Sequence, residues 1–157
     1  MLKNFTILKL ASILLPLSLV KTATTRVGTR RGKLILIVDD EPACRLALEE
    51  VLRGSGHDVH GVATREEAED LVLRHRYDVA LLDNRLSGSD STHEGLDLLC
   101  RIRARCSETR VILITGYGSA LLESTARDLG AAGYLEKPIP LERILEEMTR
   151  FGVESGP

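Results

Sequence analysis

The chain has 157 residues, 43% of them hydrophobic, and a formal net charge of −2 at pH 7. This length is sufficient for one domain with its own core and too short for two domains of ordinary size. The first 33 residues contain seven lysines and arginines and no acidic residue, so the rest of the chain has 14 basic and 23 acidic residues and a charge of −9. Such an acidic body disfavours direct binding to nucleic acid, which requires a basic surface.

The first 33 residues differ from the rest of the sequence. They contain an apolar stretch, Leu10 to Val20, that is eleven residues long and therefore too short to span a bilayer. A basic tract follows it. The pattern leaves three alternatives open: a disordered extension or misassigned start, a segment that resembles a secretory signal, or an anchor at a membrane surface. We expect no membrane contact outside this leader, and residues 152–157 are expected to form a short tail.

From Leu34 onward, short apolar runs alternate with helical patterns. The expected strands are short and bounded by turn residues, and they comprise Leu34–Asp39, Asp58–Val62, Tyr77–Asp83, Val111–Thr115 and Ala132–Glu136. The expected helices carry apolar residues at helical spacing, and they comprise Pro42–Arg53, Arg65–His75, Gly95–Arg105, Ser119–Leu129 and Leu141–Phe151. The sequence therefore predicts five consecutive βα units.

Local signals support several of these helices. Pro42 occupies the first turn of its helix, where its missing amide costs nothing. Thr64 and Glu67 form a capping box, and Gly130 is placed to end a helix in the left-handed conformation. The expected core stripe of the first helix consists of Ala43, Leu46, Ala47, Val51 and Leu52.

Alternating strands and helices predict a parallel sheet with helices on both faces and right-handed crossovers. The expected fold class is therefore α/β, a flavodoxin-like, doubly wound, five-stranded parallel sheet with strand order 2-1-3-4-5. The sequence has no Gly-x-Gly-x-x-Gly motif after the first strand and no Gly-Lys-Ser/Thr phosphate loop. A bound nucleotide is therefore not supported.

Side chains with oxygen or nitrogen donors follow four of the expected strands. Asp39 and Asp40 follow the first strand, and Asp83 ends the third. Thr115 ends the fourth strand and Lys137 follows the fifth. Because ligands bind at the carboxyl ends of such strands, these side chains are expected to converge. Crowded carboxylates require a compensating cation, and oxygen donors suit Mg²⁺ better than zinc. The sequence thus predicts a small magnesium and phosphoryl site.

These residues lie in four motifs, which are Ile-Leu-Ile-Val-Asp-Asp-Glu-Pro at 35–42, Ala-Leu-Leu-Asp at 80–83, Ile-Leu-Ile-Thr-Gly-Tyr-Gly at 112–118 and Gly-Ala-Ala-Gly-Tyr-Leu-Glu-Lys-Pro at 130–138. In this order and spacing they resemble the receiver domain of bacterial response regulators, the phosphoacceptor partner of a sensor histidine kinase in two-component signalling. The resemblance covers residues 34–151. It implies a cytoplasmic signalling protein rather than an enzyme, here expected to be a stand-alone receiver.

The resemblance also implies a role for each site residue. Asp83 would take the phosphoryl group from a histidine kinase or a phosphotransfer protein. The implied Mg²⁺ ligands are Asp39, Asp40, Asp83 and the backbone carbonyl of Arg85. Lys137 and Thr115 would mask the charge of the phosphoryl oxygens, and the bond from Lys137 to Pro138 is expected to be cis.

Phosphorylation is expected to draw the Thr115 hydroxyl toward the phosphoryl group, which leaves space for Tyr134 to turn. The resemblance places the resulting change on the face formed by the fourth helix, fifth strand and fifth helix, where a downstream protein target would bind. The candidate exposed contacts on this face are Glu123, Arg127, Glu136, Arg143 and Glu147.

The sequence departs from the family pattern after Asp83. Ser87 stands where a proline is usual, and Gly95 follows twelve residues after Asp83, farther than is usual. The longer loop adds polar residues near the acceptor, which are Ser87, Ser89, Asp90, Ser91, Thr92 and His93. Arg85 and Tyr117 are expected to flank the path of water to the acceptor and to slow hydrolysis.

Two other functions stay open. A magnesium-dependent phosphohydrolase would use Asp83 as its nucleophile, but Arg85 stands where such an enzyme needs an acid, and the chain has no room for a substrate cap domain. A receiver-like interaction module without phosphorylation is the other alternative, and the longer loop is the feature that supports it.

Overall fold

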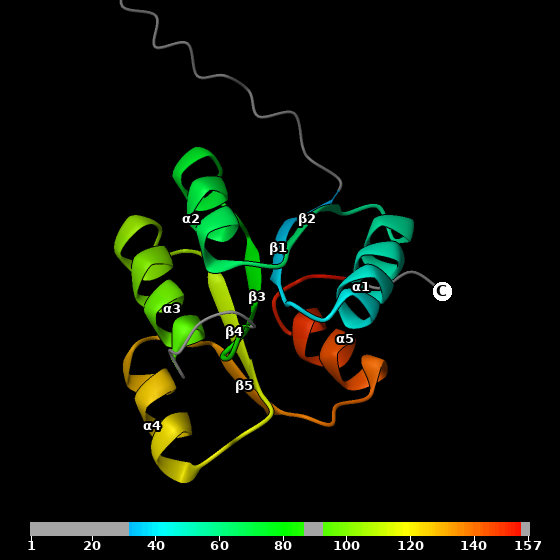
Figure 1. The fold of residues 1–157 in the computed structure, drawn as a ribbon. Coiled ribbons are helices and arrows are strands. Elements are labelled where there is room, and N and C mark those ends of the chain that lie inside the picture. The colour runs from blue at the N-terminus through cyan, green and yellow to red at the C-terminus, as the bar shows by residue number, and fades with distance from the viewer. Residues whose placement is uncertain (1–31, 87–92, 155–157) are drawn as a thin grey trace, which may run out of the picture.

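A computed structural model describes residues 32–86 and 93–154 of the chain. Its five strands form one parallel sheet in the order β2-β1-β3-β4-β5 (Figure 1). The strands are β1 (Leu34–Val38), β2 (Asp58–Val62), β3 (Val79–Asp83), β4 (Arg110–Thr115) and β5 (Gly133–Glu136). The predicted fold class and strand order are therefore confirmed.

Helices cover both faces of the sheet, as predicted (Figure 1). They are α1 (Pro42–Gly54), α2 (Arg65–Arg74), α3 (Glu94–Arg105), α4 (Ala120–Asp128) and α5 (Leu141–Thr149). The core beneath α2, α3 and α4 is separate from the core beneath α1 and α5. Within residues 32–86 and 93–154, none of the helices is long and apolar enough to cross a membrane.

The central strand β1 shows why the sheet is buried on both faces. Its residues Leu34, Leu36 and Val38 contribute to the core under α2, α3 and α4. Ile35 and Ile37 contribute to the core under α1 and α5. Since successive side chains of a strand point to opposite faces, an unbroken apolar run fills both cores.

The helix ends follow the local signals in the sequence. The Thr64 side chain accepts a hydrogen bond from the Glu67 amide, and the Glu67 carboxylate accepts one from the Thr64 amide. Gly130 has a φ of +94°, the left-handed conformation that glycine adopts without strain. Gly95 brings α3 close to the end of β3, because a Cβ atom there would lie 2.6 Å from the Asn84 Cα. The start of α3 thus packs closely against the end of β3, although the loop that connects them is longer than usual.

The predicted core stripe of α1 is partly wrong. Ala43, Leu46 and Ala47 are exposed, and Leu46 has 59% of its surface accessible. Leu52 fills the core as predicted, together with Leu48, which was not predicted. Because α1 carries apolar residues on two faces, its sequence did not decide which face meets the sheet. The pair of leucines one turn apart offers more apolar area to the sheet than the alanines do.

The ends of two elements differ from prediction by two residues, and the other ends differ by at most one residue. β3 begins at Val79 rather than Tyr77, because the Asp78 carboxylate turns to accept a hydrogen bond from the Leu34 amide at 2.8 Å. Helix α5 ends at Thr149 rather than at residue 151. The chain turns at Gly152, whose φ is +76°, and Val153 packs into the core.

Candidate functional site

The side chains that the sequence singled out lie at the carboxyl edge of the sheet. Asp39 and Asp40 follow β1, and Asp83 is the last residue of β3. Thr115 ends β4, and Lys137 follows β5. The strand order reverses between β1 and β3, which pair directly, and this topology leaves a crevice at their carboxyl ends. The predicted convergence is therefore present.

Three carboxylates meet in this crevice. Asp39, Asp40 and Asp83 each offer an oxygen, and these oxygens all lie within 4.8 Å of one another. Asp39 and Asp83 are buried. Asp39 Oδ1 accepts a hydrogen bond from the Glu41 amide at 2.9 Å, and Asp83 Oδ1 accepts one from the Arg85 amide at 3.0 Å. The backbone thus fixes the orientation of both buried carboxylates.

The donor set fits a Mg²⁺ ion. Burial raises the pKa of Asp39 despite the opposing effects of the Glu41 amide and the Lys137 ammonium. A carboxylate that is difficult to ionise in the free site gains most from a divalent cation beside it. All the clustered donors are oxygens, the ligand type that Mg²⁺ prefers. These residues can therefore hold the predicted magnesium ion.

Lys137 connects the two buried carboxylates. Its Nζ lies 2.5 Å from Asp83 Oδ2 and 3.3 Å from Asp39 Oδ2. Burial disfavours the ammonium, but the hydrogen bonds and charges of the two aspartates outweigh burial and raise the pKa of Lys137. The peptide bond between Lys137 and Pro138 is cis, as expected. Lys137 is thus a fixed cation at the predicted acceptor.

Thr115 and Tyr134 lie on neighbouring strands. Thr115 is fully buried, and its hydroxyl oxygen accepts a hydrogen bond from the Tyr117 amide at 3.2 Å. Tyr134 is half-buried, and burial raises the pKa of its phenol, while the backbone of Ser119 lowers it and the Glu136 carboxylate raises it. Glu136 also packs over Gly118, where an added Cβ would lie 2.0 Å from the Glu136 Oε1. The two predicted switch residues therefore border the same β4–α4 connection.

Two arginines near the site make contacts that sequence spacing did not predict. The Arg85 guanidinium carbon lies 4.7 Å from the centroid of the exposed Tyr117 ring. Arg45, on the first turn of α1, donates a hydrogen bond to the Asp39 backbone carbonyl at 2.5 Å. One sequence signal could have indicated the contact between Arg45 and Asp39. Arg45 follows Asp39 by six residues, in the first turn of the helix that begins after the same strand end. Both arginines hold loops of the site edge in place.

Of the candidate contacts on the α4–β5–α5 face, one is wrong. Glu147 is buried, with 4% of its surface exposed. Its carboxylate accepts hydrogen bonds from Arg150 at 2.9 and 3.1 Å and lies against β5 at Gly133. The α5 helix turns this residue inward, and the arginine compensates its charge. The other four candidates reach the surface at least in part, namely Glu123, Arg127, Glu136 and Arg143.

The extended loop lies mostly outside the described residues. This holds for Ser87, Ser89, Asp90, Ser91 and Thr92. His93 is described and occupies the N-cap position of α3. The effect of the extra loop residues on the acceptor therefore stays a prediction.

Replacing Asp39 by asparagine is expected to stabilise the metal-free protein at pH 7, by about 1 kcal/mol in the free energy of unfolding. A carboxyl whose folded pKa is raised stabilises the fold at low pH and loses this contribution as the pH rises through that pKa. The gain from Asp39→Asn should therefore disappear toward pH 4. Urea titrations at several pH values without Mg²⁺ measure this effect, with Asp70→Asn as the exposed control. A less stable Asp39→Asn variant at pH 7 would contradict it.

Comparisons with known proteins agree with this site. The response regulator receiver domain family matches residues 35–149. Sporulation initiation phosphotransferase F of Bacillus subtilis is 32% identical over 117 residues, which are 74% of this chain and 91% of that protein. Response regulator protein PilR of Pseudomonas aeruginosa is 39% identical over 111 residues, which are 71% of this chain but only 24% of that longer protein. The non-phosphorylated HemR receiver domain of Leptospira biflexa has a TM-score of 0.70 at 27% identity, covering 80% of this chain and 98% of that one. The matched range contains every residue of the carboxyl-edge site.

Proposed function

This chain belongs to the response regulator receiver domain family, and from this premise we propose that Asp83 accepts a phosphoryl group from a sensor histidine kinase or a phosphotransfer protein. Receiver domains are signalling phosphoacceptors of two-component systems. The observation that carries the assignment is the position of Lys137 Nζ, 2.5 Å from Asp83 and 3.3 Å from Asp39. A fixed cation and two oriented carboxylates are the groups that phosphoryl transfer to a carboxylate requires.

The proposed step is a displacement at phosphorus. A carboxylate oxygen of Asp83 forms a bond to the phosphorus of a phosphohistidine as the phosphorus–nitrogen bond breaks, and the released imidazole keeps the electron pair and takes a proton from water. Mg²⁺ held by the three aspartates and the Arg85 carbonyl would neutralise the phosphoryl oxygens. Lys137 and the Thr115 hydroxyl would contact the same oxygens. The protein thus contributes position and charge, and no added base is required.

The proposed signal passes from Thr115 to Tyr134. If the Thr115 hydroxyl moves to a phosphoryl oxygen, it gives up the hydrogen bond from the Tyr117 amide. The β4–α4 connection then loses the hydrogen bond that holds it to Thr115. Tyr134 can turn into the space that the Thr115 hydroxyl has left. Such a switch is an equilibrium between two states that phosphorylation biases. A downstream protein target would recognise the changed α4–β5–α5 face.

Incubation with Mg²⁺ and acetyl phosphate, followed by intact mass measurement, tests the proposed function. The expected result is the gain of one phosphoryl group that requires Mg²⁺ and is lost on addition of a chelator. No gain under any Mg²⁺ concentration would favour the interaction module without phosphorylation. Steady turnover of a generic phosphomonoester would instead favour the phosphohydrolase.

The contact between Arg85 and Tyr117 leads to a prediction about phosphoryl lifetime. We expect the double replacement Arg85→Ala and Tyr117→Ala to accelerate hydrolysis of phosphorylated Asp83 by about tenfold, because removal of both side chains admits water to the acceptor. Decay of the phosphorylated protein, followed by mass after removal of the donor, measures this rate. The pair Arg127→Ala and Leu121→Ala, on exposed positions of α4, serves as control. An unchanged decay rate in the site variant would refute the shielding role.

A further inference from the structure

An apolar groove between α1 and α5 has no occupant within the described residues. A cavity of about 280 Å³ lies between the two helices. The residues that define this α1–α5 groove are Ala43, Cys44, Ala47 and Leu48 on α1, with Ile139, Leu141 and Ile144 before and on α5. The exposed Leu46 continues the same apolar surface of α1. The face of α1 that does not fill the core is therefore available to bind another apolar segment.

The groove opens toward the phosphoacceptor site. A second cavity, of about 420 Å³, shares Cys44 and Ile144 with the groove and extends to Asp39 and Lys137. Any segment in the groove would therefore lie beside the site at which a protein partner must approach Asp83.

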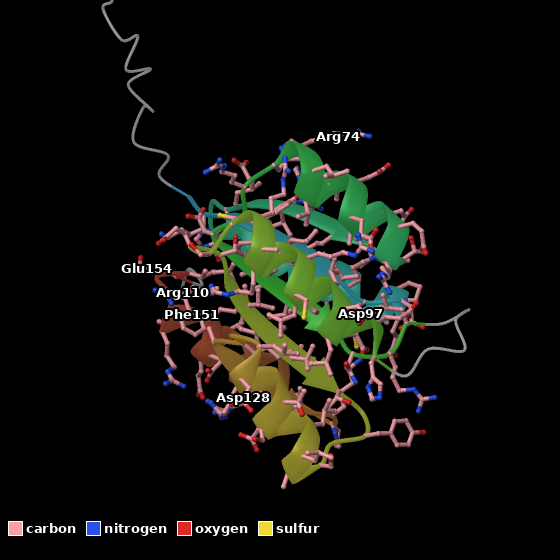
Figure 2. The ribbon with its side chains drawn as sticks, turned by 90° about the vertical axis from the view of Figure 1, so that its left-hand side faces the viewer. Arg74, Asp97, Arg110, Asp128, Phe151 and Glu154 are labelled. Atoms are coloured by element: carbon pink, nitrogen blue, oxygen red, sulfur yellow. The ribbon has the colours of Figure 1, made fainter. Side chains whose placement is uncertain are left out.

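The leader joins the folded body at the end of α1 that is farther from this groove. A Cβ atom on Gly32 would lie 2.0 Å from the Gly56 carbonyl oxygen, just beyond the end of α1. The Lys33 amide donates a hydrogen bond to His57 Nδ1 at 3.0 Å, and His57 Nε2 lies 2.6 Å from the Glu154 carbonyl oxygen beyond α5. In Figure 2, Glu154 and Arg110 lie at one end of the molecule and Asp97 lies toward the opposite end. The described chain thus starts, at Gly32 and Lys33, between the C-terminal ends of α1 and α5.

We propose that the apolar stretch Leu10–Val20 of the leader docks in the α1–α5 groove of the same molecule. The eleven residues between this stretch and Gly32 can extend to about 36 Å. Helix α1, with 13 residues, is only about 20 Å long. The connection is therefore long enough for the stretch to reach every part of the groove. A tether of this length gives an effective concentration of about 1 mM, so even a weak contact is populated.

Charge favours this groove over the other apolar groove of the molecule. Exposed acidic residues lie on both helices that form the groove, Glu50 on α1 and Glu142 and Glu146 on α5, and Glu41 lines the adjoining cavity. The leader has only basic charges. The groove between α2 and α3 is instead lined by two arginines, Arg101 and Arg105, and by one acid, Glu69, which pairs with Arg101 at 3.0 Å. Its lining carries one net positive charge, so charge favours the α1–α5 groove for the basic leader.

A docked leader would compete with a kinase or phosphotransfer protein for the space beside Asp83. This regulatory consequence rests on the proposed phosphoacceptor function, whereas the docking itself does not. The leader would then slow phosphoryl transfer from a protein donor until it is displaced.

Disulfide trapping in the full-length chain tests the docking. Cys44 lies in the groove, and Cys100 is exposed on α3 on the opposite face of the sheet. The test variant retains Cys44, carries Cys100→Ser and Cys106→Ser, and gains Leu14→Cys. The matched control retains Cys100 and carries Cys44→Ser. With oxidised glutathione, which is reduced as the two thiols join, we expect the internal disulfide to form at least about tenfold faster with Cys44 than with Cys100.

Equal rates for the two variants would overturn the proposal, and so would a disulfide-linked dimer as the main product with Cys44. Ala47→Lys, which puts into the groove a charge of the same sign as the leader, is expected to reduce the Cys44 rate to the Cys100 level. A second measurement needs no added cysteine: iodoacetamide should modify Cys44 faster when Ile13, Leu14 and Leu17 are each replaced by asparagine. If that rate is unchanged, the groove is not covered by the leader. If the disulfide with Cys44 forms but acetyl phosphate adds no phosphoryl group, the leader docks in the groove and the proposed phosphoacceptor function is wrong.

Discussion

Replacing Asp83 by asparagine is expected to abolish the phosphoryl gain from acetyl phosphate, a loss of at least about 100-fold in rate. The neutral amide lacks the anionic oxygen that attacks phosphorus, and it cannot ligate Mg²⁺ as strongly as a carboxylate does. The fold is expected to persist, because an asparagine Oδ1 can still accept the hydrogen bond that the Arg85 amide donates to Asp83 Oδ1 at 3.0 Å. Loss of phosphorylation would therefore report on chemistry rather than on unfolding.

Intact mass after incubation with Mg²⁺ and acetyl phosphate measures this loss. Asp70→Asn is the matched control, because Asp70 is exposed on α2 and contacts only Arg74, at 3.5 Å, among the ion pairs of the described residues. Asp70→Asn should gain one phosphoryl group at the wild-type rate. A phosphoryl gain in Asp83→Asn equal to that of the wild type would place the acceptor elsewhere.

Replacing Lys137 by methionine is expected to slow phosphorylation by about 100-fold, since the ammonium no longer neutralises the charge that the phosphoryl oxygens bring to Asp83. Methionine keeps much of the length of the side chain and removes the charge. The change is also expected to lower the free energy of unfolding in metal-free buffer at pH 7 by about 1–2 kcal/mol, because Asp39 and Asp83 lose a cation while they stay buried.

The stability effect of Lys137→Met has a defined pH dependence. The pKa of Lys137 is raised in the folded protein, so the contribution of its ammonium is fully present below the ordinary lysine pKa. It is lost as the pH rises through the folded pKa. The difference in stability between wild type and variant should therefore be present at neutral pH and shrink in strongly alkaline buffer. Urea titrations at neutral and alkaline pH measure it.

Lys33→Met is the matched control for this experiment. Lys33 is partly exposed, and its Nζ lies 3.9 Å from Asp78 at the opposite end of the sheet. It should phosphorylate at the wild-type rate and lose little stability. Mg²⁺ should narrow the stability gap of Lys137→Met, because a divalent cation compensates the same carboxylates. A Lys137→Met protein that phosphorylates at the wild-type rate would remove Lys137 from the proposed mechanism.

The strand ends explain why so much of the site could be predicted. A short apolar run that ends in Asp39 or Asp83 has few other structures available, because buried parallel strands present their last residues at one edge. The order of the runs then fixes which ends are neighbours. The capping box at Thr64 followed from equally local chemistry, whereas the cis bond at Pro138 was expected from the resemblance to receiver domains.

The errors arose where a residue had two plausible environments. Glu147 lies on an amphipathic helix whose rotation about its axis is set by its packing on β5, and Arg150 compensates the charge that this rotation buries. Leu46 lies on a helix with two apolar faces, only one of which meets the sheet. The contact between Arg85 and Tyr117 joins two loops that are distant in the sequence. The spacing of residues along the chain does not determine the burial of Glu147, the exposure of Leu46 or the contact between Arg85 and Tyr117.

The sequence alone therefore determined the order of the strands and helices, the carboxyl-edge cluster of Asp39, Asp83 and Lys137, and the kind of chemistry that this cluster can perform. Periodicity and residue type suffice for this, because they act over a few neighbouring residues. Only the tertiary structure decided which face of α1 stays exposed, how α5 buries Glu147, and that the leader joins the body beside the C-terminal end of α1. These features depend on how preformed elements rotate and pack to bury the most apolar area, which is a property of the whole chain.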